Sequence, residues 1–340
     1  RRLRALMEAN PFRFHVEQYD RLLDDNRALL AGILSCDKEG LAFCRNATEG
    51  VSAAATAIPL SAGDEIVTTQ HEYASFLPMW ERLCATTEAR LRVVDLPSDD
   101  HARWAETVLT HVTPRTKVLF LSQITSSTAL VLPTQVILDA LRDADIVTIL
   151  DAAHAPGQIP IDLERLLPDV YVGNLHKWAM HPRGAAFIYA SERVRDALAP
   201  TLHSWYYTAE EFDQRFSWLG TSDPTSWFVT RAAQEFHALA HDLGWDFQAT
   251  SLSTQAERRL REIPGMSSLS TEASRAPYFF AMRCATWDEP ELTQHLRSSG
   301  LWPWTGTWHG HTVLRVSTSY YTTQGDIDRL LEVMARSERH

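Results

Sequence analysis

The sequence contains little cysteine, and its cysteines are not paired. The four thiols are spread over the chain without a C-x-x-C spacing; they are Cys36, Cys44, Cys84 and Cys284. This distribution argues against the disulfide framework of a small secreted domain and against a cysteine zinc site, so we expect reduced thiols in a cytoplasmic protein. Long hydrophobic runs are also missing: no segment approaches the roughly 18 apolar residues of a membrane span, and the N-terminal stretch has no apolar core of signal-peptide length.

Positive charge is scarce as well. The 32 lysines and arginines face 43 aspartates and glutamates, which gives a formal net charge of -11, and the basic residues are dispersed. We therefore expect neither nucleic acid nor an anionic membrane as a partner. Neither G-x-x-x-x-G-K nor G-x-G-x-x-G follows a predicted strand, so a site for a nucleoside triphosphate or a dinucleotide has no motif. A small-molecule ligand is the expectation that remains.

The chain does contain enough apolar material for a large core, since 45% of its 340 residues are hydrophobic. Between residues 41 and 189, short β-rich runs alternate with helical stretches, which predicts an α/β fold with a mostly parallel sheet covered by helices on both faces. After about Pro224 a long helical run leads to short strands and a last amphipathic helix over residues 325–338. We predict an N-terminal segment (1–20) that packs with the small domain, a large domain (21–224) and a small α/β domain (225–340).

Polar residues follow several of the predicted strands, at the edge of the sheet where ligands of α/β proteins bind. The strand LAFCR leads to Asn46, Ala47 and Thr48 at a helix start, which favours either a phosphate site or a simple N-cap by Asn46 or Thr48. After DEIVTT comes Tyr73, whose ring suits either a flat ligand or an exposed loop. After TKVLFLS comes a polar cluster that includes Gln123 and suits either a ligand or a turn.

Two opposite charges end two further apolar runs. Asp151 closes DIVTIL, His154 follows it by three residues, and Lys177 lies 26 residues beyond Asp151, just after DVYVGN. A carboxylate and an amine at one sheet edge suit a cofactor that has a ring nitrogen to protonate and an aldehyde to condense with an amine. Pyridoxal phosphate is such a cofactor: a lysine holds it as a Schiff base, and an aspartate at the pyridine nitrogen keeps the ring an electron sink.

These motifs resemble a known family. DAAHAPG followed by GNLHKW resembles the class V, fold type I pyridoxal phosphate enzymes, and together with FCRNATEG, HEYAS, WLGTSD and LRVSTSYYTT the chain is most similar to the isopenicillin N epimerase-like members. The resemblance extends from about Met7 to Val333. It implies a large α/β/α domain with a smaller C-terminal α/β domain, an amino acid substrate and a homodimer with its active site at the subunit interface.

The resemblance also implies a role for each matching residue. Lys177 would bind the cofactor aldehyde and move the proton at the substrate Cα, Asp151 would hold the pyridine nitrogen, and His154 would lie beside the phenolic oxygen. The remaining cofactor contacts would come from Tyr73 stacked on the ring, from Ala47, Thr48, Asn174 and His176 at the phosphate, from Gln123 near the phenolic oxygen and the substrate, and from Thr221 at the neighbouring subunit's phosphate. Arg315 would bind the substrate α-carboxylate, for which a bidentate guanidinium is suited.

The chain also departs from its relatives. The cysteine desulfurases carry a nucleophilic cysteine about fifteen residues before the arginine, and the segment 298–312 has none, so we do not expect persulfide chemistry on the enzyme. Tyr321 replaces a common asparagine. The short glycine-containing strand that opens the family is absent, so we expect the printed chain to begin after it.

The reaction is left open among four outcomes. We favour a carbon-sulfur β-lyase that acts on a cysteine conjugate in a secondary-metabolite or thiol pathway, because no second base for epimerisation can be identified. Epimerisation, transamination and decarboxylation coupled to oxidative deamination are the alternatives, and a binding module without turnover is disfavoured by the intact Lys177, Asp151 and Arg315.

Two aromatic segments can either shape the pocket or pack in the core and interface. They contain Trp205, Tyr206, Tyr207 and Trp218 in the first segment, and Trp302, Trp304 and Trp308 in the second. His309 and His311 form an H-x-H pair, but without a third ligand we predict no metal site.

Overall fold

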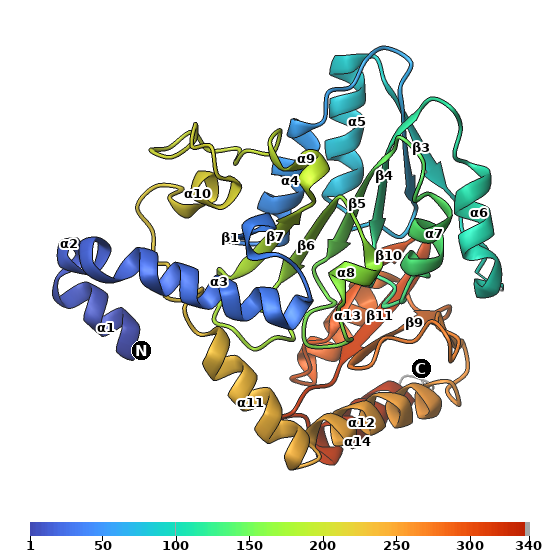
Figure 1. Ribbon diagram of the computed structural model, residues 1–340. Coiled ribbons are helices and arrows are strands. Elements are labelled where there is room, and N and C mark those ends of the chain that lie inside the picture. Colours follow the sequence, from blue (N-terminus) through green and yellow to red (C-terminus); the bar gives the residue numbers. More distant parts are fainter. Residues whose placement is uncertain (99, 337–340) are drawn as a thin grey trace.

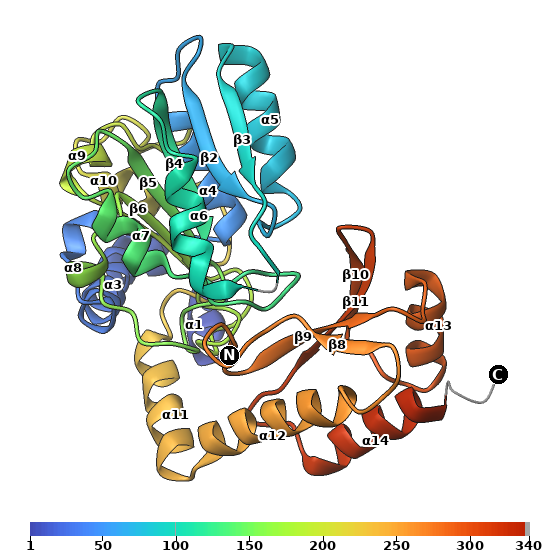
Figure 2. The same ribbon diagram turned by 90° about the vertical axis from the view of Figure 1, so that its right-hand side faces the viewer.

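The computed structural model describes residues 1–98 and 100–336, and it consists of a larger and a smaller α/β part (Figures 1 and 2). The larger part contains a seven-stranded sheet in the order β1-β7-β6-β5-β4-β2-β3. Its strands are β1 (Leu41–Cys44), β2 (Glu65–Thr69), β3 (Arg90–Val94), β4 (Thr116–Ser122), β5 (Val147–Ala152), β6 (Val170–Asn174) and β7 (Ala186–Ala190). All neighbouring pairs from β3 to β6 are parallel, and β7 is antiparallel to both of its neighbours. The mostly parallel sheet predicted from the alternating pattern is therefore confirmed.

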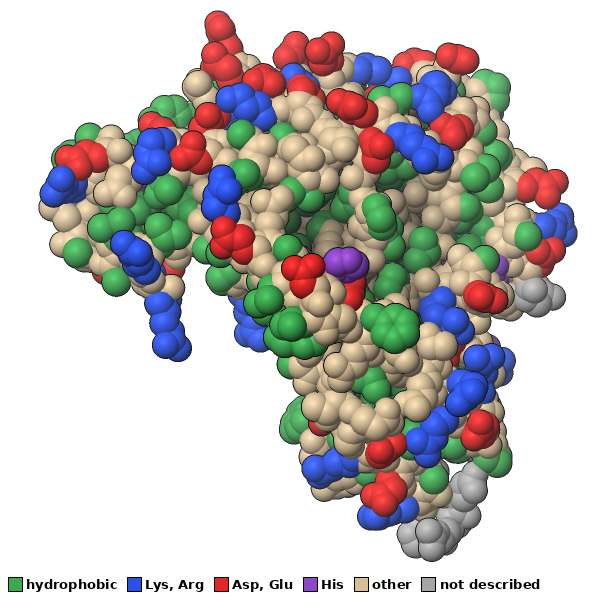
Figure 3. Space-filling view, turned by 60° about the horizontal axis from the view of Figure 1, so that its bottom comes forward, with side chains coloured by type: hydrophobic (Ala, Val, Ile, Leu, Met, Phe, Trp, Pro, Cys, Tyr) green, Lys and Arg blue, Asp and Glu red, His purple; other side chains and the backbone are tan. Residues whose placement is uncertain are grey.

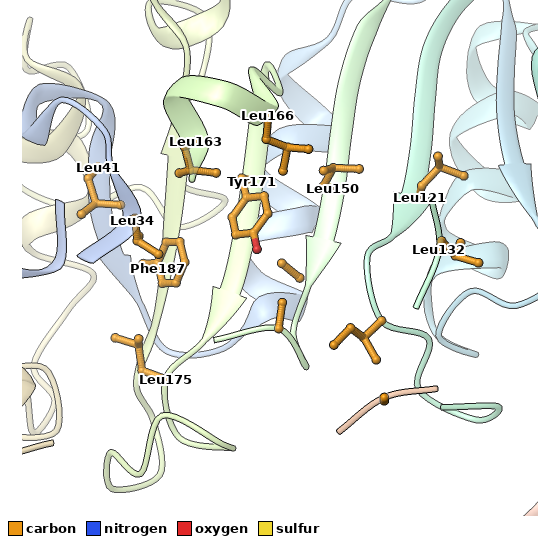
Figure 4. Close-up of a cluster of buried hydrophobic side chains, with 14 of the residues drawn as sticks. Leu34, Leu41, Leu121, Leu132, Leu150, Leu163, Leu166, Tyr171, Leu175 and Phe187 are labelled. Carbon is orange, nitrogen blue, oxygen red and sulfur yellow. The ribbon is translucent and has the colours of Figure 1, made fainter. Parts of the chain in front are cut away.

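Helices cover both faces of this sheet. One face carries α4 (Ala47–Ala57), α5 (Phe76–Thr87), α9 (Glu192–Arg195) and α10 (Phe212–Ser217), and the other carries α3 (Asp20–Leu34), α6 (Trp104–Thr110), α7 (Thr134–Ala140) and α8 (Leu163–Leu166). Side chains alternate between the two faces along each strand: in β4, Phe120 packs in one hydrophobic cluster, and Leu119 and Leu121 pack in the other. Figure 4 shows part of the second cluster, where the Tyr171 ring lies among leucines.

The smaller part is built on the antiparallel sheet β10-β11-β9-β8. Its elements are α11 (Thr230–Asp242), α12 (Trp245–Leu260), β8 (Met266–Ser268), β9 (Phe279–Cys284), α13 (Glu289–Ser298), β10 (Trp304–Trp308), β11 (His311–Ser317) and α14 (Gln324–Ala335). The first two helices join it to the larger part (Figure 2). The last helix begins one residue before the predicted start, at a capping box of Thr323 and Asp326; residues 337–338 of the predicted helix lie outside the described residues.

One face of the small sheet is turned towards the large domain. In β9, Phe280 and Met282 pack in the small domain's own core, whereas Phe279 and Ala281 join the core cluster of the large domain. In β11, Val313 does the same, and Arg315 lies on its side of the strand because side chains alternate. The small domain therefore contributes side chains to the edge of the large sheet.

The N-terminal segment comprises α1 (Arg2–Ala9), α2 (Pro11–Phe14) and the π-helical turn His15–Tyr19. Its contacts with distant parts of the chain run to residues 217–228: Phe14 packs against Phe228, and His15 packs against Trp218. These contacts lie at the predicted boundary between the domains, and the three domain limits stay predictions. Charged side chains of both signs are spread over the face shown in Figure 3, and hydrophobic side chains gather in a hollow near its middle.

Candidate active site

A cavity of about 190 Å³ lies at the carboxyl ends of the central strands. Eight residues that the sequence predicts for the site line it: Ala47, Thr48, Tyr73, Asp151, His154, Asn174, His176 and Lys177. Asn46, one of the two predicted N-caps, also lines it, as do three residues without a predicted role: Phe76, Ser126 and Ala153. Gln123, Thr221 and Arg315 do not line the cavity. The strand ends thus bring the central predicted residues together, as expected for parallel strands that share an edge.

The helix start at one end of the cavity is held by two asparagines. Asn46 is the N-cap of α4, and its side chain accepts a hydrogen bond from the backbone N–H of Glu49 at 2.9 Å. Asn174, at the end of β6, accepts from the backbone N–H of Ala47 at 2.8 Å. The capping role therefore belongs to Asn46, and Thr48 stays exposed at the first turn, where the helix dipole favours an anion.

Gly50 allows this helix to lie close to the sheet. A Cβ atom built on Gly50 would meet Val172 of β6 at 2.6 Å, which is far inside the normal contact distance. A larger residue would push α4 away from β6, and with it the start of the helix away from Asn174.

Asp151 is a buried carboxylate at the wall of the cavity. Its Oδ1 atom accepts a hydrogen bond from the backbone N–H of Ala153 at 2.9 Å. Burial raises the pKa of Asp151 to about 6, although the Ala153 N–H and the charge of Lys177 act in the opposite direction. The carboxylate is therefore poised to accept a cationic N–H partner.

Lys177 lines the same cavity and lies next to His154. Its Nζ atom is 2.9 Å from His154 Nε2. Burial lowers the pKa of Lys177 to about 8; the Asp151 charge opposes this change and the Arg315 charge adds to it. A larger fraction of the amine is thus free at neutral pH than for an exposed lysine, and the free amine is the nucleophilic form. His176, beside Lys177, faces the Ala185 carbonyl with Nδ1 at 2.6 Å.

Tyr73 and Gln123 occupy different depths. Tyr73 is 41% exposed at the rim and meets the Phe76 ring edge-on, with centroids 5.6 Å apart. Gln123 is buried and does not line the cavity, and its Oε1 accepts a hydrogen bond from the Tyr171 hydroxyl at 2.5 Å. The predicted contacts of both residues with a cofactor stay predictions, and Tyr171 is a partner of Gln123 that no motif indicated.

Arg315 reaches the site from β11 of the small domain. Its Nη1 donates to the Ser126 carbonyl at 2.5 Å, and its guanidinium lies over the rings of Trp304 and Phe279, at 5.0 and 5.7 Å. Burial lowers its pKa to about 10. In residues 1–98 and 100–336, no carboxylate forms an ion pair with Arg315, and its buried Nε has no hydrogen-bond partner. A partly buried guanidinium without a counter-ion is costly, so an anionic ligand would be favoured here.

A buried glutamate also lies at this edge. Glu72 accepts hydrogen bonds from the hydroxyls of Thr69, at 2.7 Å, and Ser122, at 2.6 Å. Burial raises its pKa to about 8, against the effect of these hydrogen bonds. The motif HEYAS contained the residue, but only the fold shows that it is buried behind the end of β4.

The aromatic segments do not line the cavity of about 190 Å³. Trp304 touches Arg315, Trp308 stacks on His71 with centroids 4.7 Å apart, and Trp205 stacks on Trp218 at 5.6 Å. Tyr321 is 81% exposed and also lies outside the cavity. Trp304 is therefore the tryptophan with a direct link to a predicted substrate contact.

Size alone would favour other cavities: a space of about 1140 Å³ lies at the surface between α12, α13 and α14 of the small domain, away from the predicted residues. A space of about 540 Å³ lies between α3 and α11, but apolar side chains dominate its wall and neither an acid nor a lysine nor an arginine lines it. The smaller cavity carries the reactive groups, so we place the site there. Among the described residues, no group of three or more His, Cys, Asp and Glu side chains is placed to hold a metal ion, and no helix is long and apolar enough to cross a membrane.

Comparisons with known proteins identify a family. The family model described as Aminotransferase class-V matches residues 10–330. The isopenicillin N epimerase of Amycolatopsis lactamdurans is 31% identical over 98% of this chain and 89% of its own length, and that of Streptomyces clavuligerus is 29% identical over 97% and 88%. A solved complex of a cystine C–S lyase with cysteine persulfide superposes with a TM-score of 0.84 at 21% identity, over 98% of this chain and 91% of that chain.

Proposed function

Because the chain belongs to the class-V aminotransferase family and is a pyridoxal phosphate-dependent enzyme, we propose that it acts at Cα and Cβ of an amino acid as a carbon-sulfur β-lyase. The substrate would be a cysteine conjugate. The observation that carries the proposal of an amino acid substrate is the partly buried guanidinium of Arg315, which is bonded to the cavity-lining Ser126 but forms no ion pair with a described carboxylate and has a buried Nε without a hydrogen-bond partner.

The residues of the cavity fit the cofactor. A buried carboxylate that lines the cavity, Asp151, suits the protonated pyridine nitrogen, and the amine of Lys177 suits the aldehyde. The exposed Thr48 at the start of α4 suits the phosphate, with Asn174 holding that helix start in place. When bound, the cofactor supplies an electron sink for the charge left at the substrate Cα.

Arg315 would fix the substrate at its α-carboxylate. Nη1 is already held by the Ser126 carbonyl, which leaves the Nε and Nη2 edge for two parallel hydrogen bonds. The rings of Trp304 and Phe279 restrain the guanidinium plane. This arrangement would orient the substrate amine and Cα–H towards the cavity that contains Lys177.

Lys177 would then carry the proton. It is the only amine among the described residues that line the cavity, and its pKa of about 8 leaves a larger fraction of free base at neutral pH than an exposed lysine has. One base suffices for β-elimination, because the proton is taken from Cα and a thiolate departs from Cβ. None of the four cysteines lines the cavity, so the sulfur would leave as a free thiol and not as a persulfide on the enzyme.

The test is to incubate the loaded enzyme with S-substituted cysteines and to measure pyruvate, ammonia and free thiol. Equal amounts of the three products would support the lyase. Racemised substrate without any thiol would reject it, and protein that stays colourless after incubation with pyridoxal phosphate would reject the cofactor site as proposed.

Epimerisation of an amino acid is the second candidate. It is favoured by the two isopenicillin N epimerases, which are 29–31% identical to nearly the whole chain. Chiral chromatography of the unreacted substrate, with exchange of the Cα hydrogen in D₂O, distinguishes the lyase from the epimerase. A lyase consumes the substrate, whereas an epimerase returns it as both enantiomers.

We also propose a homodimer that shares its sites. Thr221 is exposed in the loop between α10 and α11 and does not line its own chain's cavity, which suits a contact with the phosphate of a second copy. Sedimentation equilibrium should give the mass of two chains, and Thr221→Ala should weaken cofactor binding while the dimer persists. A cytoplasmic location also stays a proposal.

A further inference from the structure

His154 is hydrogen-bonded at both ring nitrogens. Its Nε2 atom faces Lys177 Nζ at 2.9 Å, and its Nδ1 atom faces the indole Nε1 of Trp178 at 3.2 Å. The imidazole is buried and stacks on Phe279, with centroids 5.0 Å apart and planes 18° apart. Two consecutive residues of one turn therefore hold both ends of the same ring.

The chemistry of the indole decides where the imidazole proton lies. An indole N–H can only donate, so His154 Nδ1 must present its lone pair to Trp178. Burial, together with the charges of Lys177 and Arg315, lowers the pKa of His154 well below its usual value, so the ring is neutral and carries its single proton on Nε2. An Nε2–H group can bond to Lys177 only by donating, which requires a lone pair on Nζ.

We propose that Trp178 is a positioning residue that fixes His154 as the Nε2–H tautomer and thereby favours the free-amine form of Lys177, which condenses with the cofactor aldehyde. The opposite tautomer would turn a lone pair towards Lys177 and favour the ammonium form, which cannot attack a carbonyl carbon. Condensation of a free amine with an aldehyde releases one water. The inference deepens the proposed function, because it assigns a role in loading the cofactor to a residue outside the cavity lining.

The surroundings of Trp178 keep the indole in this position. Its ring packs against Phe279 and Tyr278 of the small domain, at 5.4 and 5.9 Å. Gly157 lies against the backbone of the same turn: a Cβ atom there would be 2.4 Å from the carbonyl group of Trp178. The charged groups that face the Lys177 and His154 pair are Asp151 from β5 and Arg315 from β11.

The test removes the indole N–H and keeps an aromatic ring. In Trp178→Phe, the ring still packs on Phe279, but Nδ1 of His154 loses its donor. Trp104→Phe is the matched control, because its indole N–H also makes a hydrogen bond, to the Pro97 carbonyl, in a different part of the fold. The first measurement is ¹⁵N NMR of histidine-labelled, cofactor-free full-length protein, with His154 assigned by its disappearance in His154→Gln.

The expected spectrum of the parent and of the control shows His154 with a protonated Nε2 and a bare Nδ1, and that of Trp178→Phe shows the proton moved to Nδ1 or shared. A bare Nε2 in the parent, or an unchanged tautomer in Trp178→Phe, overturns the proposal. The parent spectrum decides by itself if the variant does not fold.

The second measurement is the pH dependence of covalent pyridoxal phosphate uptake, trapped by borohydride. We expect the midpoint of Trp178→Phe to rise by about one pH unit, which is about tenfold less free amine at a fixed lower pH. An unchanged midpoint counts against the proposal. Because the tautomer is read without cofactor, protein that takes up no pyridoxal phosphate refutes the proposed function and leaves the tautomer result intact.

Discussion

Replacing Arg315 with lysine should weaken the binding of amino acids. The loss should come only from their α-carboxylate, so that ligands without this group are little affected. Nη1 of the guanidinium donates a hydrogen bond to the Ser126 carbonyl. Its remaining Nε and Nη2 edge can donate two parallel hydrogen bonds to a carboxylate. A lysine ammonium keeps the charge but cannot reproduce that pair. The loss of one charge-assisted hydrogen bond costs about 1.5–3 kcal/mol, which corresponds to roughly ten- to hundredfold weaker binding.

The assay is a titration of the loaded enzyme with an L-amino acid and with its α-amide, followed by the visible absorbance of the cofactor. In Arg315→Lys the acid should bind at least tenfold more weakly, whereas the amide should change little. Arg297→Lys is the matched control, because Arg297 also stacks on a tryptophan, Trp302 at 5.1 Å. Equal losses for acid and amide would refute the assigned role, as would undiminished binding of the acid.

Three further predictions follow from the site. Lys177→Ala should abolish the adduct that borohydride traps, and mass spectrometry of the reduced protein would detect any that remains. Uptake of the cofactor by the parent should rise with pH through about 8, the pKa of Lys177, because the amine is charged below that pH. Asp151→Asn removes the carboxylate that raises this pKa, so the pH midpoint of cofactor uptake should be lower in that variant. Gly157 and Gly63 both have a positive φ, of 85° and 86°, but an added Cβ would clash with backbone only at Gly157. In urea unfolding, Gly63→Ala should therefore lower the free energy of unfolding by about 1–2 kcal/mol. Gly157→Ala should lower it by more.

The sequence predicted the core of the site because that core depends on strand ends. Asp151 lies at the end of β5 and Lys177 follows the end of β6 by three residues, so the alternation of strands and helices was enough to bring these two to one edge. Asn174, the last residue of β6, was assigned by resemblance. The antiparallel β7 was not predicted, since a single strand's pattern does not state its direction.

The sequence pattern did not predict contacts between side chains of distant segments. Nothing local in the sequence indicates that Gln123 turns to Tyr171 or that Phe279 packs on His154, because side-chain directions depend on how the two domains meet. Arg315 was assigned by resemblance alone, and only the fold shows that none of the described acidic residues forms an ion pair with it. Trp178 was part of the motif GNLHKW without a role of its own, and only the folded structure shows its hydrogen bond to His154.

Phe279 makes the two halves of the site mechanically dependent on each other. This one ring, at the start of β9, touches the imidazole of His154, the indole of Trp178 and the guanidinium of Arg315. A displacement of the small domain would therefore move Arg315, the proposed contact for the substrate carboxylate, and His154, the neighbour of Lys177, together. In a series of substitutions that weaken the packing of the Phe279 ring, we therefore expect substrate affinity and the pKa of Lys177 to change together. A substitution at the boundary between the domains would not change one of these properties without the other.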